Sequence, residues 1–303
     1  MPYPSPITYP SPLLFPGDGA GGRNLGNLVA IGDLLLNYID DAGVHWILEK
    51  FAGWGSPASS AELTQRARGH GATSSEGFLR PRVMTLEGLI DAPTPEALTL
   101  AAEQLAAAVS LSGFRLLVSE TGRVRHVEAQ RQDDVIVTEV SPTVAAYSIQ
   151  VVAKDPRKFG DLITASTRLP FSSGGLVYPA TYPVTYTGVS GTGKITVDNA
   201  GNTEAPVWLR IEGPIPAGGH SVTHLGKGQT LTFGTALALG AGEFLTVDMD
   251  RREVLAQGQA PRSGYVTSRG WFSLDPGVNE IAFASQNYSE TANLTVSTKP
   301  AWQ

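Results

Sequence analysis

The sequence predicts a mainly β protein of two domains, with a single helix in the first. Turn-forming residues are abundant, with 34 glycines and 21 prolines among 303 residues. Short stretches of alternating apolar and polar residues recur along the whole chain, and only residues 94–109 show a sustained helical spacing. We therefore expect an N-terminal antiparallel β-sandwich or split barrel with one α-helix, followed by a C-terminal β-sandwich.

Composition narrows the functional classes. The net charge is −6 and no basic stripe is present, so stable nucleic-acid binding is not expected. Cysteine is absent, which excludes disulfides, a thiolate nucleophile and cysteine-ligated metals. No run approaches the roughly 18 apolar residues of a membrane helix, and the N-terminus lacks the pattern of a secretory signal.

Residues 1–27 form a proline- and glycine-rich N-terminal arm. The repeat Tyr3-Pro4-Ser5-Pro6 returns at residues 9–12, and a glycine cluster follows at residues 17–26. Dense prolines favour an extended conformation, and glycines make a chain flexible. Two interpretations stay open, a disordered tail and an arm that becomes ordered against a neighbouring subunit.

The first domain spans residues 28–160. Strands are expected at residues 29–33, 43–48, 78–90, 114–119, 124–129 and 135–140, with a turn at residues 40–42. Residues 53–77 have no sustained period, and a loop of this length is usually functional or ordered by a partner.

The predicted helix has clear signals at both ends. Thr94 suits the N-cap, Pro95 the first helical position, and Glu96 the positive end of the helix dipole. Gly113 is expected to end the segment. The apolar stripe consists of Leu98, Ala101, Ala102, Leu105, Ala108 and Val109.

The segment Val144–Gly160 marks the end of the first domain. Its first half is a strand with residues 145, 147, 149, 151 and 153 on one face. Pro156 has no N–H to donate to a sheet, and it biases Asp155 away from the helical region, so the strand must end there. Asp155 is also expected to accept hydrogen bonds from nearby main-chain N–H groups.

The second half of the chain is predicted to contain strands and turns only. We expect a linker at residues 161–175 and a β-sandwich at residues 176–303. Turn residues separate short strands at intervals typical of a sandwich. The expected strands are residues 194–198, 206–211, 220–225, 229–233, 243–248, 253–256, 265–267, 279–284 and 293–297.

No motif supports an enzyme. Residues 17–22 fit G-x-G-x-x-G, but no strand precedes them, and residues 188–194 lack the Ser or Thr of a phosphate-binding loop because Ile195 stands there. Asp248 and Asp250 could contribute to a calcium site, although a hairpin turn over residues 249–252 is favoured. We expect no catalytic residues, no cofactor and no metal site.

Several motifs, in this order, resemble the distal tail proteins of long-tailed, siphovirus-type bacteriophages. In the first domain they are Arg68-Gly69-His70-Gly71, Arg82-Val83-Met84-Thr85-Leu86-Glu87-Gly88 and the stretch from Val151 to Gly160. In the second they are Asn199-Ala200-Gly201-Asn202, Gly213-Pro214 and Leu274-Asp275-Pro276-Gly277-Val278-Asn279. The resemblance covers the chain from about Leu28, and it implies a galectin-like sandwich of jelly-roll type in the second domain.

The resemblance implies a structural virion protein at the distal tip of a phage tail. Such proteins form a hexameric ring between the tail tube protein and the tail-tip hub protein, with a lumen for DNA passage. The first domain would make the ring, which requires a head-to-tail interface that closes on itself.

Five residues are candidates for contacts. Arg157, Lys158 and Phe159 follow the last strand of the first domain, where a second subunit or the tube could offer carboxylates to the basic pair; the alternative is that the pair is solvated. Phe159 could instead hold the exit segment against the first domain. As an alternative function, the second domain would bind host-surface carbohydrate, with Trp208 and Trp271 as stacking candidates. The competing interpretation is that each indole packs under a neighbouring loop.

Overall fold

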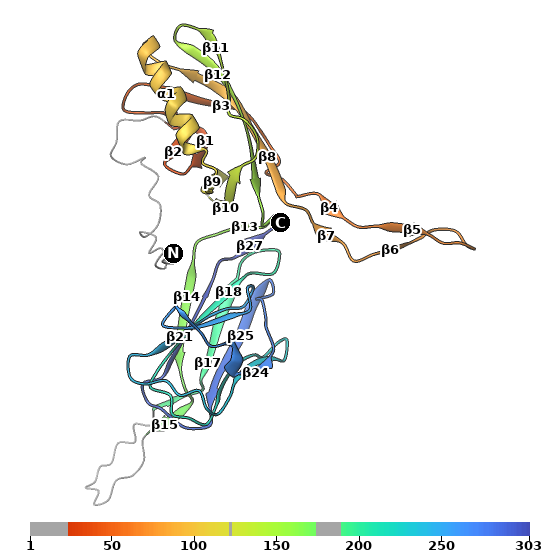
Figure 1. Cartoon of the computed structure of the whole chain (residues 1–303), viewed down its shortest axis with the longest axis vertical. Coiled ribbons are helices and arrows are strands. Elements are labelled where there is room, and N and C mark those ends of the chain that lie inside the picture. Colours follow the sequence, from red (N-terminus) through yellow and green to blue (C-terminus); the bar gives the residue numbers. More distant parts are fainter. Residues whose placement is uncertain (1–23, 121–122, 174–188) are drawn as a thin grey trace, which may run out of the picture. The chain divides into compact units, whose positions relative to one another are not determined.

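The computed structural model describes residues 24–120, 123–173 and 189–303, which divide after Asp161 into two compact units (Figure 1). The proline-rich repeat and the G-x-G-x-x-G sequence lie outside the described residues. Each unit is mainly antiparallel β-sheet. No helix in the described part is long and apolar enough to cross a membrane.

The N-terminal unit is built on one antiparallel sheet that closes on itself. Its strands follow the order β11-β12-β8-β3-β2-β1-β9-β10-β13, and the last residues of β10 also pair with the end of β12 through Ala129↔Ala153. This closure makes the predicted split barrel. The strands are β1 (Asn24–Ile31), β2 (Leu34–Ile39), β3 (His45–Ala52), β8 (Arg82–Asp91), β9 (Phe114–Glu120), β10 (Arg123–Arg131), β11 (Ile136–Ser141), β12 (Val144–Ala153) and β13 (Lys158–Phe159).

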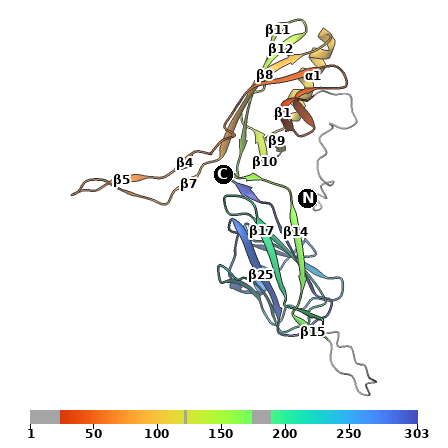
Figure 2. The same ribbon diagram turned by 180° about the vertical axis from the view of Figure 1, so that it is seen from behind.

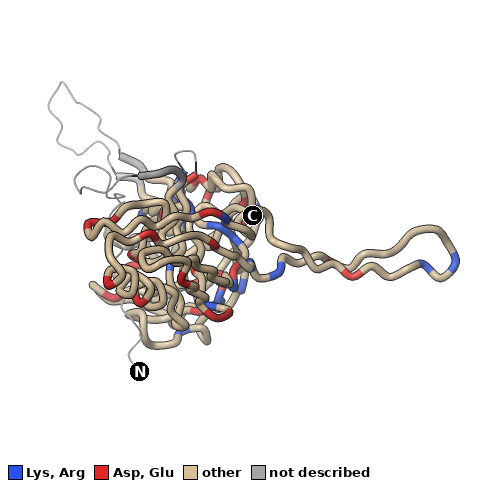
Figure 3. Tube along the Cα trace, turned by 90° about the horizontal axis from the view of Figure 1, so that it is seen from above, with Lys and Arg blue, Asp and Glu red and all other residues tan. Residues whose placement is uncertain are grey.

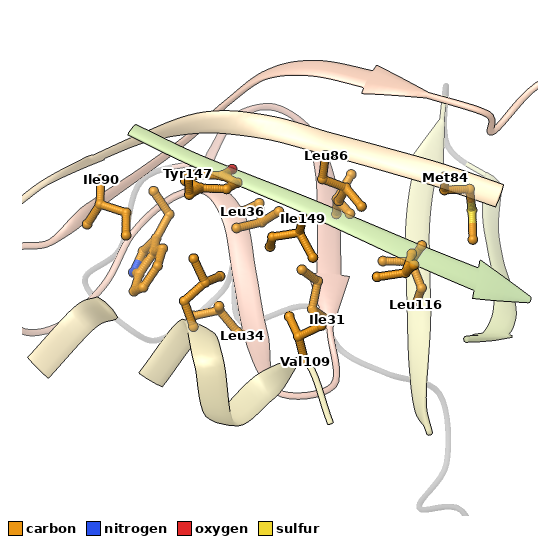
Figure 4. Packing of buried hydrophobic residues seen from close by; sticks show 14 of the residues in the cluster. Ile31, Leu34, Leu36, Met84, Leu86, Ile90, Val109, Leu116, Tyr147 and Ile149 are labelled. Atoms are coloured by element: carbon orange, nitrogen blue, oxygen red, sulfur yellow. The ribbon is translucent and has the colours of Figure 1, made fainter. Parts of the chain in front are cut away.

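Helix α1 (Pro95–Ala108) joins β8 to β9 and completes the core of this unit. Its start confirms the N-cap signal, because the Thr94 side chain accepts a hydrogen bond from the N–H of Ala97. The predicted end at Gly113 is wrong, since the helix ends at Ala108 with Val109 as the C-cap, whose N–H donates to the carbonyl of Leu105. The buried side of the helix packs into the same cluster as β2, β8 and β12 (Figure 4). The labelled side chains of that cluster are Ile31, Leu34, Leu36, Met84, Leu86, Ile90, Val109, Leu116, Tyr147 and Ile149.

Gly88 allows a close approach at the centre of the sheet. It pairs with Tyr147 of β12, and a Cβ placed on it would lie 1.9 Å from the carbonyl oxygen of Ile47. Without that Cβ, the Tyr147 hydroxyl reaches the same carbonyl and donates a hydrogen bond of 3.0 Å. Burial raises the pKa of Tyr147, so the phenol keeps its proton. A β-bulge at Leu48–Lys50 accompanies this arrangement.

Two segments of this unit differ from the prediction. Residues 34–39 form β2, although only a turn was expected between the first two strands. Residues 53–77, predicted as a loop, are ordered as part of a hairpin with strands β4 (Ser59–Ser60), β5 (Leu63–Gln65), β6 (Ala72–Ser74) and β7 (Phe78–Leu79). Both were missed because their apolar residues do not alternate over enough positions to indicate a strand.

The C-terminal unit contains two main antiparallel sheets, with orders β14-β26-β18-β21-β22-β23 and β17-β25-β19-β20-β24. The small sheet of β15 and β16 is separate. The elements are β14 (Ile163–Arg168), β15 (Phe171–Ser173), β16 (Val189–Gly191), β17 (Lys194–Asn199), β18 (Val207–Glu212), β19 (His220–His224), β20 (Gln229–Phe233), β21 (Phe244–Asp248), β22 (Glu253–Ala256), β23 (Ala260–Pro261), η1 (Ser263–Tyr265), β24 (Val266–Arg269), β25 (Gly277–Ser285), β26 (Asn293–Thr298) and β27 (Ala301–Trp302).

The predicted core of the sandwich is confirmed, and the predicted linker needs a correction. Residues 163–168 are not a linker, because they form β14 and pair with β26 from Ile163↔Thr298 to Arg168↔Asn293. This edge strand was not predicted because its residues are mostly small and polar and show no sustained alternation with apolar ones. The predicted core side chains are all buried: Val207, Leu209, Ile211, Leu245, Val247, Ile281 and Phe283.

The buried side-chain amide of Asn279 holds the turn formed by the motif from Leu274 to Asn279. The Asn279 side chain donates to the carbonyls of Asp275 and Gly277, and its Oδ1 accepts from the N–H of Asp275. The same oxygen lies 2.9 Å from Nε2 of His224, whose Nδ1 accepts from the N–H of Lys227. This assignment places the His224 proton on Nε2. The network fixes the turn before β25.

Phe283→Ala is expected to destabilise the C-terminal unit by about 3–5 kcal/mol, because it leaves a cavity in a closed core. Phe283 is 1% exposed, whereas Val278 on the same strand is 73% exposed. Denaturant unfolding of the two alanine variants measures the difference, and Val278→Ala should change stability little. If Phe283→Ala left the midpoint of the unfolding transition unchanged, the wild-type phenyl ring would have to lie at the surface.

Candidate functional site

The hairpin formed by residues 53–81, called here the long hairpin, projects from the N-terminal unit (Figures 1 and 2). Its two strands pair in two short stretches, Ser59↔Leu79 to Ser60↔Phe78 and Leu63↔Ser74 to Gln65↔Ala72. Between them, Glu62 and Ser75 exchange hydrogen bonds of 2.9 Å. The hairpin is thus held together mainly by its backbone.

The long hairpin has no core of its own. Nearly all its residues beyond Gly55 are exposed, and two large apolar side chains, Leu63 at 70% and Phe78 at 63%, are among them. An isolated two-stranded hairpin is at best marginally stable in water. Exposed apolar side chains on an extended, solvent-surrounded hairpin are typical of a segment that packs against another molecule.

Charge is distributed along the long hairpin in a simple pattern (Figure 3). Arg66, Arg68 and His70 lie at the turn that ends it, and no acidic residue occurs between Glu62 and Glu76. The tip is therefore positively charged, in a protein whose net charge is −6. Such a tip favours an acidic surface on whatever molecule the hairpin contacts.

Arg82 anchors the root of the long hairpin. Its side chain is 1% exposed at the start of β8. Nη1 donates to the carbonyls of Gly53 at 3.0 Å and Trp54 at 2.8 Å, and also to that of Gly55. Nε donates to the carbonyl of Pro156 at 2.9 Å. One guanidinium therefore ties the outgoing strand of the hairpin to the segment that follows β12.

Lys158 lies in the same place and is also buried. Its Nζ is 5.1 Å from the centroid of the Trp54 ring, a cation–π contact that partly offsets the loss of hydration. Burial, followed by the charges of Arg82 and Arg125, lowers the pKa of Lys158, while Glu120 acts in the opposite direction. The neighbourhood of the hairpin root thus carries an excess of positive charge.

The three predicted contact residues occupy different environments. Arg157 binds its neighbour Asp155 in a bidentate ion pair, with Nη2 to Oδ2 at 2.7 Å, and Asp155 also accepts from the N–H of residue 157 as expected. Phe159 is buried against the His126 ring, so it holds the exit segment to the first unit. Lys158 is neither solvated nor at the surface of the described chain.

Sequence reasoning did not identify Arg82 as an inward-facing residue, although a signal was present. Arg82 is in phase with Met84, Leu86 and Ile90, which form the buried face of β8. A charged residue at a buried position of a strand must be paired or hydrogen-bonded. The same reasoning does not reach Trp54, because residues 53–58 have no periodic pattern.

Trp208 and Trp271 do not form one site. Trp208 is half-buried on the outer face of the sheet that contains β18, as the alternation predicted, and its Nε1 donates to Asp248 at 3.1 Å. Trp271 follows β24, which belongs to the other main sheet.

Asp248 also accepts from the N–H of Arg251, which confirms a turn at residues 249–252. Among the described residues, no group of three or more potential ligands could hold a metal ion.

A cavity of about 580 Å³ lies in the C-terminal unit, where the ends of β19 and β20 meet β24, β25 and η1. His220 lies at this cavity, with its imidazole stacked on Phe233 at a centroid distance of 4.6 Å. Neither ring nitrogen of His220 has a hydrogen-bond partner among the described residues. Burial lowers the pKa of His220 to about 4, so the ring is neutral near pH 7.

Replacing Arg82 by Met should loosen the hairpin root, because carbonyls 53–55 lose their common donor. We expect a loss of about 1–3 kcal/mol in the stability of the N-terminal unit and faster hydrogen exchange at residues 53–55. Arg80→Met, an exposed change two residues away, is the matched control. Equal exchange in the two variants would show that Arg82 does not hold the root.

His220 should make the C-terminal unit less stable in acid. Its pKa is about 4 when folded and 6.5 in a model peptide, so the unfolded chain binds the proton more strongly. The neutral ring of His220 therefore adds to the free energy of unfolding of this unit. This stabilisation is complete above pH 6.5 and is lost as the pH falls through 4, with a total loss of about 3 kcal/mol. Unfolding titrations of wild type and His220→Phe would measure it, with the exposed His70→Phe as control. Parallel pH profiles for wild type and His220→Phe would contradict the prediction.

Comparison with known protein families gives one match, to the model described as "Siphovirus-type tail component, C-terminal domain", over residues 200–302. No curated protein sequence matches the chain. The matched region covers most of the C-terminal unit, including the turn built around Asn279.

Solved structures extend the similarity to the N-terminal unit. The crystal structure of the SPP1 Dit protein (gp 19.1), described as a paradigm of the hub adsorption apparatus in phages that infect Gram-positive hosts, has a TM-score of 0.62 at 11% identity. The alignment covers 85% of this chain and 93% of that protein. A chain of the phage p2 baseplate, in its activated conformation with strontium, gives a TM-score of 0.49 at 11% identity over 89% of this chain and 97% of that chain. Residues 200–302 thus match a siphovirus-type tail component domain, and the chain has the fold of the SPP1 Dit protein, in agreement with the resemblance carried by the motifs.

Proposed function

We propose that this chain is a structural component of a phage tail tip, and that copies of it assemble through the N-terminal unit into a ring, most simply a hexamer. The ring would join the tail tube protein to the tail-tip hub protein and leave a lumen for DNA. The proposal is supported by the family match of residues 200–302 and by the shared fold of SPP1 Dit, a protein of the hub adsorption apparatus in phages that infect Gram-positive hosts. It assigns the chain no enzymatic role.

The observation that carries the ring is the long hairpin. Beyond its root at Trp54, nearly all of its residues are exposed in the described structure, Leu63 and Phe78 among them. A projecting element that docks on the next copy gives a head-to-tail contact, which forms a closed ring when the rotation between copies closes. The positive tip also suits a neighbour of the same composition, because the whole chain is acidic.

A second exposed apolar row lies on β11, which forms one end of the strand order in the N-terminal sheet. Ile136 and Val140 on this strand are both more than half exposed, and Asp133, Asp134 and Glu139 lie close in sequence. Strand edges with exposed apolar side chains readily pair with another chain. This edge offers the hairpin both apolar surface and opposite charge.

Arg157 remains a proposed interface residue, whereas Lys158 and Phe159 are better suited to holding the segment after β12. The guanidinium of Arg157 is already paired with Asp155, so a carboxylate from a neighbour would join an existing ion pair. Lys158 is buried over the Trp54 ring, so its ammonium group could contact a neighbouring subunit only if the hairpin root moved away from it. A charge reversal at Lys158 would disturb the fold and would not test the interface alone.

Carbohydrate binding by the C-terminal unit is the second candidate function. It rests on Trp208, whose indole lies on an outer sheet face and is fixed there by Asp248. On the same face, Arg210 stacks on Phe244 with its Cζ 3.6 Å from the ring centroid and pairs with Glu212. A flat face with an anchored indole and charged hydrogen-bonding groups is suited to stacking on a sugar ring.

The double variant Leu63→Asp with Phe78→Asp should prevent ring formation without unfolding either unit, since both side chains are exposed. Mass photometry of the full chain, alone and with assembled tail tube protein, reports the oligomer, and circular dichroism reports the fold. Leu100→Asp on α1, where the wild-type side chain is 66% exposed, is the matched control. Arg157→Glu in the same assay tests the proposed ion pair.

Two results would contradict the ring. One is a wild-type chain that stays monomeric at high concentration and on the tube template. The other is a hairpin variant that assembles as fully as the Leu100→Asp control, which would exclude the long hairpin from the interface.

A further inference from the structure

The cavity at the ends of β19 and β20 has the size of a small-molecule site. Its volume of about 580 Å³ falls within the range of roughly 300–1,000 Å³ that ligand pockets occupy. Every residue that lines it belongs to the C-terminal unit. It lies on the sheet that contains β20 and β24, whereas Trp208 lies on the other main sheet. This cavity is therefore distinct from the face proposed above for sugar stacking.

The lining of the cavity is polar but uncharged. No Asp, Glu, Lys or Arg occurs among the described residues that line it. Hydroxyl groups come from Ser221, Thr232, Thr235 and Thr267, which lie on or directly after neighbouring strands of one sheet. Because charged ligands need an opposite charge or a dense set of donors when they leave water, this lining favours a neutral ligand.

One aromatic side chain stands at the rim. Tyr265 ends the short helix η1 and is 40% exposed, and it lines the cavity together with Gly264. The aromatic face and the hydroxyl of tyrosine suit a ligand with an apolar face and a polar edge. The backbone beside it is fixed, because the N–H of Gly234 donates to the carbonyl of Tyr265 at 2.7 Å.

Uncharged contacts hold the part of the cavity around His220 and Gly219. His220 stacks on Phe233, and Gly219 next to it accepts from the Ser285 hydroxyl and from the N–H of Gln286. Gly219 has a φ of +96°, and a Cβ there would lie 3.1 Å from the carbonyl of Phe233. The tight turn therefore keeps this end of the cavity clear of side chains. A preformed site binds with less loss of entropy.

We propose that this cavity binds a neutral pyranose sugar, with the sugar ring against Tyr265 and its hydroxyls bonded to the threonine and serine side chains. A hydrocarbon ligand would form no hydrogen bond with those hydroxyls, and an ionic ligand would find no counter-charge among the described lining residues. A neutral sugar has an apolar C–H face and several hydroxyls, and it satisfies both parts of the lining. The inference does not depend on the ring-forming function.

Saturation-transfer NMR on the full chain tests the proposal with a panel of neutral methyl pyranosides of the gluco, galacto, manno and N-acetylgluco series. At least one should receive saturation, and Tyr265→Ala should raise its dissociation constant about tenfold, which corresponds to about 1.4 kcal/mol. Gly264→Trp is a second variant, since a Cβ at Gly264 meets no atom within 4 Å and the backbone there can carry a side chain. It should obstruct the cavity and weaken binding similarly.

Val278→Ala, an exposed change outside the cavity lining, is the control and should leave binding unchanged, whereas Trp208→Ala tests the outer face of the other sheet. Signal from none of the neutral sugars would overturn the proposal. Binding that survives both Tyr265→Ala and Gly264→Trp, or that is lost in Trp208→Ala instead, would also overturn it, and the latter result would place the sugar on the outer face of the other sheet. Stronger binding of an acidic or amino sugar than of its neutral parent would contradict the uncharged character of the site.

Discussion

The N-terminal unit depends on the hydrogen bonds of one buried guanidinium. Arg82 binds the carbonyls of residues 53–55 and of Pro156, so the hairpin root, the start of β8 and the end of β12 share one donor group. A buried cation is costly unless it is hydrogen-bonded, so the backbone around Arg82 must keep the conformation that presents those carbonyls. The bonds are made by Nε and Nη1, whereas Nη2 has no partner among the described residues. Backbone carbonyls far apart in sequence are thereby held at one point.

This constraint explains how a hairpin without a core can leave the barrel in a defined direction. Its free end has only backbone pairing, whereas its root is held by Arg82 and by Trp54, whose ring also contacts Lys158. Side-chain contacts therefore hold the hairpin where it joins the closed sheet, whereas backbone pairing connects its strands near the charged tip. In the proposed docking, the root would set the direction of approach to the partner.

The C-terminal unit is organised differently, since a network of polar side chains fixes one of its turns. Asn279, His224 and Lys227 fix one turn, and Lys227 also pairs with Glu204 and Asp275. These contacts lower the pKa of Glu204 and raise that of Lys227. A sandwich stabilised in this way keeps its outer faces and its cavity free for small ligands, whereas the N-terminal unit exposes apolar side chains suited to another protein.

The sequence by itself determined which residues are buried wherever a local pattern is enough. The alternation in β12, the Thr94 cap of α1 and the outward face of Trp208 all follow from backbone periodicity and were predicted correctly. Only the tertiary structure decided where Arg82 and Lys158 find their partners, that Trp208 and Trp271 lie on different sheets, and that β14 is a strand. Those outcomes depend on contacts between segments distant in sequence, and local periodicity contains no information about such pairings.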